Sequence, residues 1–488
     1  MSFNSLQFAL FLPIVFLLYW LVFDKLIGKS KHQLRLQNAF VVLASYVFYG
    51  WWDKQFLILI FITSFSSWLS GLLIENAKSR KASKIWMVVN IVVNIGILAF
   101  FKYYRFFVVE FCQAFHVLLN KALLKVILPV GISFYTFQAV SYSIDVYRKK
   151  TEATRDILAF FAFISFFPQL VAGPIERATN LLPQFLRKRE FSQQLATDGM
   201  RQILWGLFKK TVIADNCALH VKAVFYWSSK MVIPGSDLLL AAIIYSFQVY
   251  ADFSGYSDMA IGTSKLFGIK LMQNFRFPYF SRDMAEFWRR WHISLNSWFR
   301  DYIYIPLGGS QTKRVIVVRN IFVVFILSAM WHGAGLNYIL WGVYHALLLT
   351  LLFLLGKNRK HLDVVASGRL LPNLKEFGQM LITFMLVTFG RIIFCCDNLQ
   401  SFSHYVAGMA QWGTLCAVYR FFIQSDMWPM NLLICIMLVV EWLQRDKEFG
   451  LDIRFIKYGW IRWSIYLIIS VMIIMVGGLP EPFVYFQF

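Results

Sequence analysis

The chain has 488 residues, of which 58% are hydrophobic and 18% aromatic, while only 15% are charged. A soluble domain is typically about a quarter charged and just under half apolar, so a soluble protein of this composition would expose far too much apolar surface. The formal net charge is +22, but the lysines and arginines lie in short loops between apolar runs. That is the positive-inside pattern of a membrane protein, and it leaves no basic extramembrane domain to bind nucleic acid.

Apolar runs long enough to cross a bilayer recur along the whole chain. We therefore predict an all-α, polytopic protein embedded in a lipid bilayer, with about 11–13 spanning and re-entrant helices. No stretch between these runs is long enough for a soluble domain, so residues 1–488 are predicted to form one membrane-embedded domain. The candidate spans are residues 6–23, 36–51, 56–74, 85–101, 126–147, 156–172, 201–219, 238–262, 316–332, 336–355, 377–394, 429–443 and 461–478.

The loops predict the orientation of the spans. Those after the first and third candidate spans are rich in lysine and arginine, which places them in the cytoplasm and the N-terminus outside. The run over residues 156–172 has a basic cluster on both sides, and one span cannot begin and end on the same side of a membrane. We predict that it enters the membrane and returns, because Pro168, Gly173 and Pro174 stop a helix within a few residues. A more polar connector at 395–428 is predicted to lie outside.

The stretch over residues 265–319 carries ten lysines or arginines and three acids, so it is predicted to face the cytoplasm. Inside it, residues 287–299 are predicted to form one aromatic helix, in which Trp288, Trp291 and Leu295 recur near helical spacing. Such a helix should lie half buried and reach into the protein from the cytoplasmic side. Charged and histidine side chains among apolar runs are expected to line a cavity, so chemistry is expected here.

His332 is the strongest candidate for a catalytic residue. It ends an apolar run, directly after Trp331, and the sequence Gly333-Ala334-Gly335 follows. The glycines break the helix and let another molecule approach the backbone closely. A neutral imidazole in a dry site is a suitable general base for a hydroxyl, since its ordinary pKa of about 6.5 lies near working pH. The alternative is a structural histidine whose ring is satisfied by a neighbouring carbonyl.

Two further histidines lie near apolar runs. On a continuous helix, His292 would share a face with Trp288 and Leu295, so it is predicted to point inward and to bind or orient a substrate or assist the base. The alternative for His292 is a packed, hydrogen-bonded core residue. His345, in the sequence WGVYHALLL, is predicted to be structural or to line a pore.

Four arginines cluster around His292 in the sequence. A guanidinium forms paired hydrogen bonds to phosphate, so the cluster could hold the diphosphate of a nucleotide-linked donor such as coenzyme A at the cytoplasmic mouth. The alternative for any one arginine is anchoring to lipid headgroups. The candidate donor-binding residues are Arg282, Arg289, Arg290, Arg300, Trp291 and Asn296.

The sequence DFSGYSD places Asp252, Ser254 and Asp258 at a polar break in an apolar run. Paired carboxylates can do acid–base work. We favour a supporting role, in which they pair with the arginines of the central stretch or cap a helix. The sequence lacks the phosphate-binding glycine loop, the GxSxG elbow, HExxH and any Cys/His metal spacing, so hydrolase and metalloenzyme functions lose their usual support.

Four segments, in this order, together resemble the membrane-bound O-acyltransferase family. They are VAGPIERATNLLPQF (171–185), QVYADFSGYSDMAIG (248–262), NFRFPYFSRDMAEFWRRWHISLNSWFRDYIYIPLGG (274–309) and MWHGAGLNYILWGVYH (330–345). The resemblance covers about residues 130–350 and is closest to the bacterial branch of alginate and peptidoglycan O-acetylation.

The resemblance implies a ring of helices around a central funnel. It also implies that His332 is the family's intramembrane catalytic histidine and that His292 occupies its second polar position. The donor would be acyl-CoA, most simply acetyl-CoA, or an acyl-carrier thioester, used as a substrate with no bound cofactor or metal. The acyl group would pass across the bacterial cytoplasmic (inner) membrane to an exported SGNH or serine-hydrolase-like partner that modifies an exopolysaccharide such as alginate, or the cell wall. The family pattern leads us to expect a basic and a small residue at positions 395 and 396. Cys395 and Cys396 depart from that pattern.

Three alternatives stay open at this point. One is D-alanyl transfer from a carrier protein to teichoic acid. Another is a transporter or lipid scramblase that uses an arginine-lined cavity for anionic cargo; such proteins commonly have paired internal repeats, which this sequence lacks. A third is a non-catalytic scaffold for an outer partner, in which both His332 and His292 could be replaced without consequence.

Overall fold

The structure is a computed structural model, and it describes residues 1–26, 32–114, 128–228, 233–396, 398–411 and 428–484. Every regular element in these ranges is a helix. Three predicted features fall partly outside the described residues: the loop after the first candidate span, the candidate span 126–147, whose first two residues are not described, and half of the connector 395–428.

Eight helices in the described ranges are long and apolar enough to cross a membrane. Together with the all-helical secondary structure, they confirm the prediction of a polytopic helical membrane protein. The other candidate spans correspond to shorter or more polar helices. The eight are Leu6–Phe23, Lys54–Glu75, Arg80–Val109, Gly235–Leu266, Arg314–His332, Leu336–Leu354, Leu374–Cys395 and Gly459–Val476.

The contacts divide the chain into two compact units. The first unit consists of Met1–Met200 with Ala260–Met272, and the second of Arg201–Met259 with Gln273–Phe488. Helices α9 (Gln193–Leu207) and α11 (Gly235–Leu266) contribute residues to both. The expectation of one domain stays a prediction.

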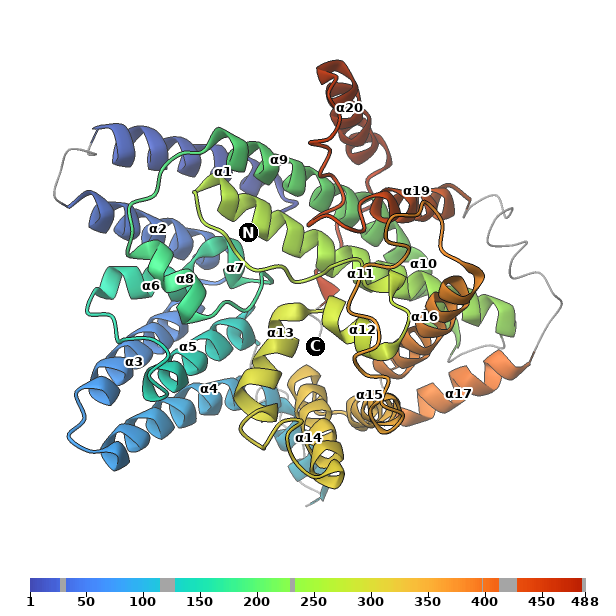
Figure 1. The fold of residues 1–488 in the computed structure, drawn as a ribbon, viewed down its shortest axis with the longest axis horizontal. Coiled ribbons are helices and arrows are strands. Elements are labelled where there is room, and N and C mark those ends of the chain that lie inside the picture. The colour runs from blue at the N-terminus through green and yellow to red at the C-terminus, as the bar shows by residue number, and fades with distance from the viewer. Residues whose placement is uncertain (27–31, 115–127, 229–232, 397, 412–427, 485–488) are drawn as a thin grey trace. The chain divides into compact units, whose positions relative to one another are not determined.

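In the first unit, α3, α4 and α5 pack against one another, and α2 packs on α6 (Figure 1). Polar groups join these helices: the Asn90 amide donates to the Ser143 hydroxyl at 2.7 Å, and the Ser67 hydroxyl donates to the Asn90 amide oxygen at 3.2 Å. Such bonds satisfy polar side chains away from water. The helices are α1 (Leu6–Leu17), continued by a π-helix to Leu26, α2 (Gln33–Gly50), α3 (Leu57–Glu75), α4 (Arg80–Ala114), α5 (Ile132–Tyr147), α6 (Ile157–Ser165), α7 (Phe167–Leu170) and α8 (Ala178–Phe185).

The run over residues 156–172 is broken, in line with the turn predicted from its prolines and glycine. Helix α6 ends at Ser165, Phe166 leaves the helical conformation, and the four residues of α7 follow with Pro168 in the first turn. The two pieces have nine and four residues, and at 1.5 Å per residue neither reaches the roughly 30 Å of a bilayer core.

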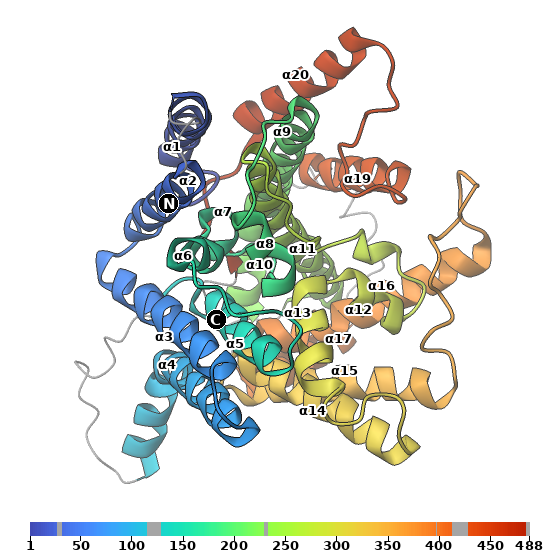
Figure 2. The ribbon, with the colours of Figure 1, turned by 60° about the vertical axis from the view of Figure 1, so that its left-hand side comes forward.

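The second unit holds the histidine candidates. In it α14 and α15 run side by side, with α12 and α16 packed on α15 (Figures 1 and 2). The helices are the π-helix η4 (Phe208–Ala214), α10 (Asp215–Ser228), α12 (Met284–Arg290), α13 (Ile293–Phe299), the π-helix η6 (Arg300–Tyr304), α14 (Arg314–His332), α15 (Leu336–Leu354), α16 (Leu374–Cys395), α17 (Leu399–Ala410), α19 (Trp428–Leu443) and α20 (Gly459–Val476).

The prediction of one continuous helix over residues 287–299 is wrong. Helix α12 ends at Arg290, Trp291 is extended, and His292 adopts a left-handed conformation with φ of 43° before α13 begins. Hydrogen bonds from outside the helix hold this break: the Ile293 amide donates to the Asn274 carbonyl at 2.9 Å. The break places His292 at the start of α13 instead of on a helix face shared with Trp288.

Helices α9 and α11 approach very closely at Gly206 and Gly255. A Cβ added to Gly255 would lie 2.7 Å from the Gly206 carbonyl oxygen, and one added to Gly206 would lie 2.5 Å from that of Gly255. Real Cβ atoms do not approach backbone so closely, so both positions require glycine. The contact brings Lys209 and Lys210 of η4 to the carboxylates of α11.

We predict that Gly255→Val destabilises the protein by about 1–3 kcal/mol, the usual cost of overpacking a close contact. The measurement is the thermal melting temperature of the purified protein in detergent. Gly378→Ala is the matched control, because a Cβ at Gly378 meets nothing within 4 Å. If Gly255→Val and the wild type have the same melting temperature, the close packing of these helices is contradicted.

Candidate active site

His332 is the last residue of α14 and is only 5% exposed. Three aromatic rings surround it, with ring centroids 4.6 Å away for Trp331, 5.2 Å for Trp341 and 5.0 Å for Phe394. The rings come from α14, α15 and α16, so the enclosure depends on the packing of three helices. Such an enclosure keeps bulk water from the imidazole.

The turn after His332 explains the glycines in the sequence. A Cβ added to Gly333 would lie 2.3 Å from the Tyr338 ring, and one added to Gly335 would lie 2.3 Å from the Asn337 amide oxygen. The Asn337 amide also donates to the Cys396 carbonyl at 2.8 Å. The two glycines thus let the start of α15 fold tightly back onto α14, which fixes His332 against α15 and α16.

His292 lies on the other side of Trp331, whose ring centroid is 6.1 Å from that of His292. It is 2% exposed, and its Nδ1 lies 3.0 Å from the Asn274 side-chain oxygen. The Ser294 backbone amide, which can only donate, points at the same Asn274 atom at 3.4 Å, so this atom is the amide oxygen. Nδ1 of a neutral His292 therefore carries the proton, and Nε2 keeps the lone pair.

His345 completes the group. It is 3% exposed on α15, and its ring centroid lies 4.9 Å from Trp341 and 5.0 Å from Trp288. Trp341 contacts both His345 and His332, so a continuous column of rings runs from Trp288 through His345, Trp341 and His332 to Phe394. The structure thus brings all three candidate histidines together in the second unit.

A cavity of about 320 Å³ opens at the Trp288 end of this column. Trp288 and Phe325 form its apolar wall, and both rings also contact His345. Of the candidate donor-binding residues, Arg289, Arg300 and Asn296 line the cavity, where Arg359 joins them. Guanidinium groups beside an aromatic wall form a surface that suits a phosphorylated ligand with a flat ring.

Arg300 pairs with Asp301 at 2.7 Å on the surface. The other two candidate arginines are buried and paired with carboxylates. Arg282 pairs with Glu286 at 3.1 Å and with Asp363 at 2.9 Å, while Arg290 pairs with Glu286 at 2.6 Å. Trp291, another candidate, packs its ring on Phe287. These contacts hold α12 and the loop at Asp363 together, so the four arginines that cluster in the sequence separate into two groups in space.

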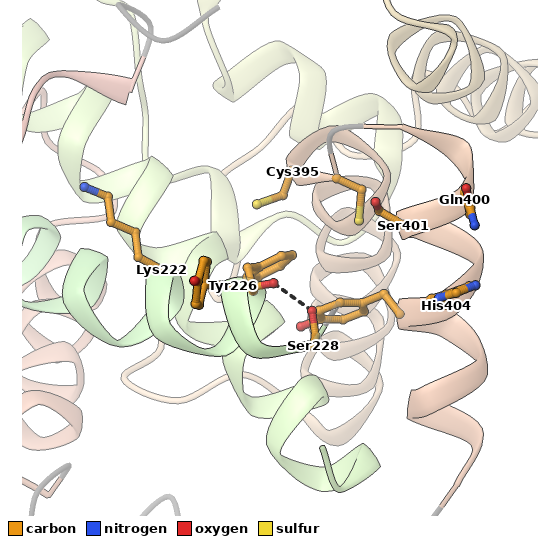
Figure 3. Close-up of a pocket in the computed structure, with 10 residues that line it drawn as sticks. Lys222, Tyr226, Ser228, Cys395, Gln400, Ser401 and His404 are labelled. Carbon is orange, nitrogen blue, oxygen red and sulfur yellow. Dashed lines mark hydrogen bonds between the residues drawn. The ribbon is translucent and has the colours of Figure 1, made fainter. Parts of the chain in front are cut away.

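A second cavity, of about 570 Å³, is lined by residues that follow Phe394 in the chain and by residues of α10 (Figure 3). Helix α10 provides Lys222 and Tyr226 on one side, and Cys395, Ser401 and His404 face them from the end of α16 and from α17. Cys395 directly follows Phe394 in the chain. One ring of the column, Trp288, thus lines the first cavity, and the second cavity is lined by Cys395 and Cys396, the two residues that follow Phe394.

A model of the membrane-bound O-acyltransferase family matches residues 47–388. The chain belongs to the membrane-bound O-acyltransferase family. It is accordingly an O-acyltransferase and a multi-pass membrane protein, as the four sequence segments predicted.

Named relatives lie in the bacterial branch of the family. The chain is 40% identical to the probable alginate O-acetylase AlgI of Pseudomonas aeruginosa, over 85% of this chain and 76% of the relative. It is 34% identical to the peptidoglycan O-acetyltransferase of Helicobacter pylori, over 82% and 77%. The teichoic acid D-alanyltransferase of Bacillus subtilis is 32% identical, over 54% of this chain and 68% of the relative.

The carboxylates of the DFSGYSD motif pair with lysines, and not with the arginines of the central stretch. Lys210 lies 2.8 Å from Asp252, and Lys209 lies 2.7 Å from Asp258. Lys209 also donates to the Ser254 hydroxyl at 2.9 Å. These buried pairs join η4 to α11. The supporting role stays a prediction.

Sequence reasoning missed several residues of this site. Trp341 and Phe394 lie in apolar runs where nothing marks them as neighbours of His332. No role is predicted for Arg391 from the sequence, although it is the one charged residue within the candidate span 377–394. An isolated charge inside a membrane span is costly, so its presence there was a usable signal.

We predict that His292→Asn makes the protein less sensitive to acid. Burial lowers the pKa of His292 to about 3, from an ordinary value of 6.5. Below pH 6.5 the unfolded chain therefore takes up a proton that the folded protein does not, and the free energy of unfolding falls by up to about 1.4 kcal/mol per pH unit. Asparagine cannot titrate, tolerates the left-handed backbone, and can donate to Asn274.

The melting temperature at pH 7.5 and pH 5.0 tests this prediction. The wild type should lose more stability between the two values than His292→Asn. Identical losses in the two proteins would show that His292 is as easily protonated in the folded state as in the unfolded one.

Proposed function

We propose that this protein moves an acetyl group from a cytoplasmic thioester, acetyl-CoA, to a hydroxyl group on the outer side of the bacterial cytoplasmic membrane. His332 acts as the general base. The observation that carries the proposal is the position of His332: it is enclosed by aromatic rings and belongs to a column of rings that begins at Trp288, in the wall of the cavity lined by arginines.

The loops support the direction of transfer. The cavity of about 320 Å³ is lined by residues from the basic stretches around Arg289, Arg300 and Arg359, which the distribution of positive charge places in the cytoplasm. The phosphates of the donor bind these guanidinium groups, and the acyl arm runs along Trp288 toward the histidines. The larger cavity contains Cys395 and residues of α17, from the connector predicted to lie outside.

In the proposed step, the acetyl group and one proton are transferred without a cofactor or metal. The His332 imidazole takes the proton of the acceptor hydroxyl, and the oxygen attacks the carbonyl carbon of the thioester. The carbonyl oxygen becomes an oxyanion; it then reforms the double bond as the carbon–sulfur bond breaks. The leaving thiolate takes the proton from His332, which is again neutral. Water would compete with the acceptor, so the aromatic enclosure limits hydrolysis.

The relatives suggest the kind of acceptor. Those that align over most of this chain are named for O-acetylation of alginate and of peptidoglycan. We infer that the acetyl group reaches an exported polysaccharide by way of an SGNH or serine-hydrolase-like protein that docks at the outer cavity. The D-alanyltransferase relative aligns over about half of this chain, so D-alanyl transfer from a carrier protein is the less supported alternative.

We predict that His332→Ala abolishes acetyl transfer while the protein still folds in the membrane. The assay uses inside-out membrane vesicles from the native cell, with the chromosomal gene deleted and a plasmid copy supplied. Radiolabelled acetyl-CoA is added outside the vesicles, and base-labile label on material in their lumen is counted. Removing a general base together with its proton transfer should lower the rate at least 100-fold.

An immunoblot of the vesicles and the melting temperature of the purified variant control for folding. If His332→Ala transfers label at the wild-type rate, the general-base role is wrong. If even the wild type transfers none while a labelled anionic cargo enters the vesicles, the transporter alternative takes its place. Normal polymer acetylation after replacing both His332 and His292 would favour a scaffold.

We predict that Arg300→Gln raises the KM for acetyl-CoA about tenfold and leaves kcat nearly unchanged. The substitution removes one charge-assisted hydrogen bond to a donor phosphate, made equally in the ground and transition states. Arg369→Gln is the matched control, because Arg369 pairs with Glu376 away from both cavities. Equal KM values for Arg300→Gln and wild type would remove Arg300 from the donor site.

A further inference from the structure

Arg391 is a buried arginine that neither the sequence motifs nor the proposed mechanism uses. It lies on α16, within an apolar helix long enough to cross the membrane, and is 5% exposed. Its guanidinium carbon lies 4.1 Å from the centroid of the Trp291 ring, so the cation stacks on that indole. Its Nε has no hydrogen-bond partner in the described part of the chain.

No carboxylate in the described ranges forms an ion pair with Arg391. Four other cations buried in the second unit differ in this respect, since Lys209, Lys210, Arg282 and Arg290 each have a carboxylate within 2.9 Å. A cation–π contact returns less than the desolvation of a guanidinium costs. A buried charge left without a counter-ion therefore points to an anion that is present only during function.

The surroundings of Arg391 place it among the candidate catalytic groups. Trp291, under the guanidinium, directly precedes His292. Gly390, the preceding residue on α16, packs so closely on His345 that a Cβ there would lie 2.7 Å from Nε2 of that ring. Phe394, three residues later, is a neighbour of Arg391 on the helix surface and contacts His332. Arg391 is therefore flanked on α16 by residues that contact His345 and His332, and its guanidinium stacks on the residue that precedes His292.

The acceptor and the donor carry no permanent negative charge at the reacting atoms. The one anion that forms there is the oxyanion of the tetrahedral intermediate, which appears when the acceptor oxygen bonds to the carbonyl carbon and disappears when the carbon–sulfur bond breaks. We propose that Arg391 stabilises this oxyanion with its fixed positive charge. The inference rests on the proposed acetyl transfer and adds a residue to it. A fixed cation in a dry site favours the transition state over the neutral substrate.

The test compares Arg391→Gln, Arg391→Met and Arg391→Lys with wild type in the same vesicle assay. Arg391→Gln and Arg391→Met should lower kcat about 100- to 1000-fold, the effect of removing one oxyanion-stabilising group, with KM for acetyl-CoA changed less than threefold. Arg391→Lys keeps the charge, so its kcat should be at least tenfold higher than that of Arg391→Gln. Arg369→Gln, which removes an exposed charge, should match the wild type.

A structural role for Arg391 predicts a different pattern. In that case all three variants would melt at lower temperature, and Arg391→Met, which suits an apolar surrounding, would be the most active of them. Full activity of Arg391→Gln, or equal loss in the lysine and glutamine variants, overturns the proposal. If the wild type and Arg369→Gln are active and His332→Ala is not, such a result counts against Arg391 alone; an inactive wild type counts against acetyl transfer itself.

Discussion

The enclosure of His332 by aromatic rings is the constraint on which the rest of the site depends. An imidazole that activates a hydroxyl beside a thioester must be shielded from water, or water becomes the acceptor. Trp331, Trp341 and Phe394 provide this shield from three helices. The tight turn at Gly333–Gly335 is needed because a longer connection would let α14 and α15 separate at the histidine.

The charges in the second unit follow a clear division. Lys209 and Lys210 are neutralised by the carboxylates of α11, and Arg282 and Arg290 by Glu286. These pairs hold helices and loops together. Removing one partner of such a pair leaves a buried charge, which is more damaging than the pair is stabilising. Arg391 stands apart because its position beside the histidines is matched by no carboxylate in the described residues.

The sequence predicted the helical membrane fold and the family, because apolar runs and the four motif segments are local features. It also placed His332 correctly at the end of a helix before a glycine turn. It failed at residues 287–299, where helical spacing of the aromatic residues predicted one helix. Asn274 lies outside this stretch, and its hydrogen bonds to His292 and Ile293 hold the break in the helix. The local spacing of residues does not predict these bonds. The spacing of residues also does not predict that Arg289 and Arg300 separate from Arg282 and Arg290. That separation depends on ion pairs with Glu286 and Asp363.

The break at His292 also explains how one stretch can contribute both to the wall of the arginine-lined cavity and to the group of buried histidines. A continuous helix would carry Trp288 and His292 on one face, and both would meet the same surroundings. With the helix interrupted, Trp288 remains at the cavity wall while His292 turns toward Asn274 and Trp331. The strained backbone of His292, with φ of 43°, is held by hydrogen bonds on both of its sides. Strain of this kind persists only where the surrounding structure enforces it, and here it lets the arginine-lined cavity wall and a buried histidine lie within a few residues of each other.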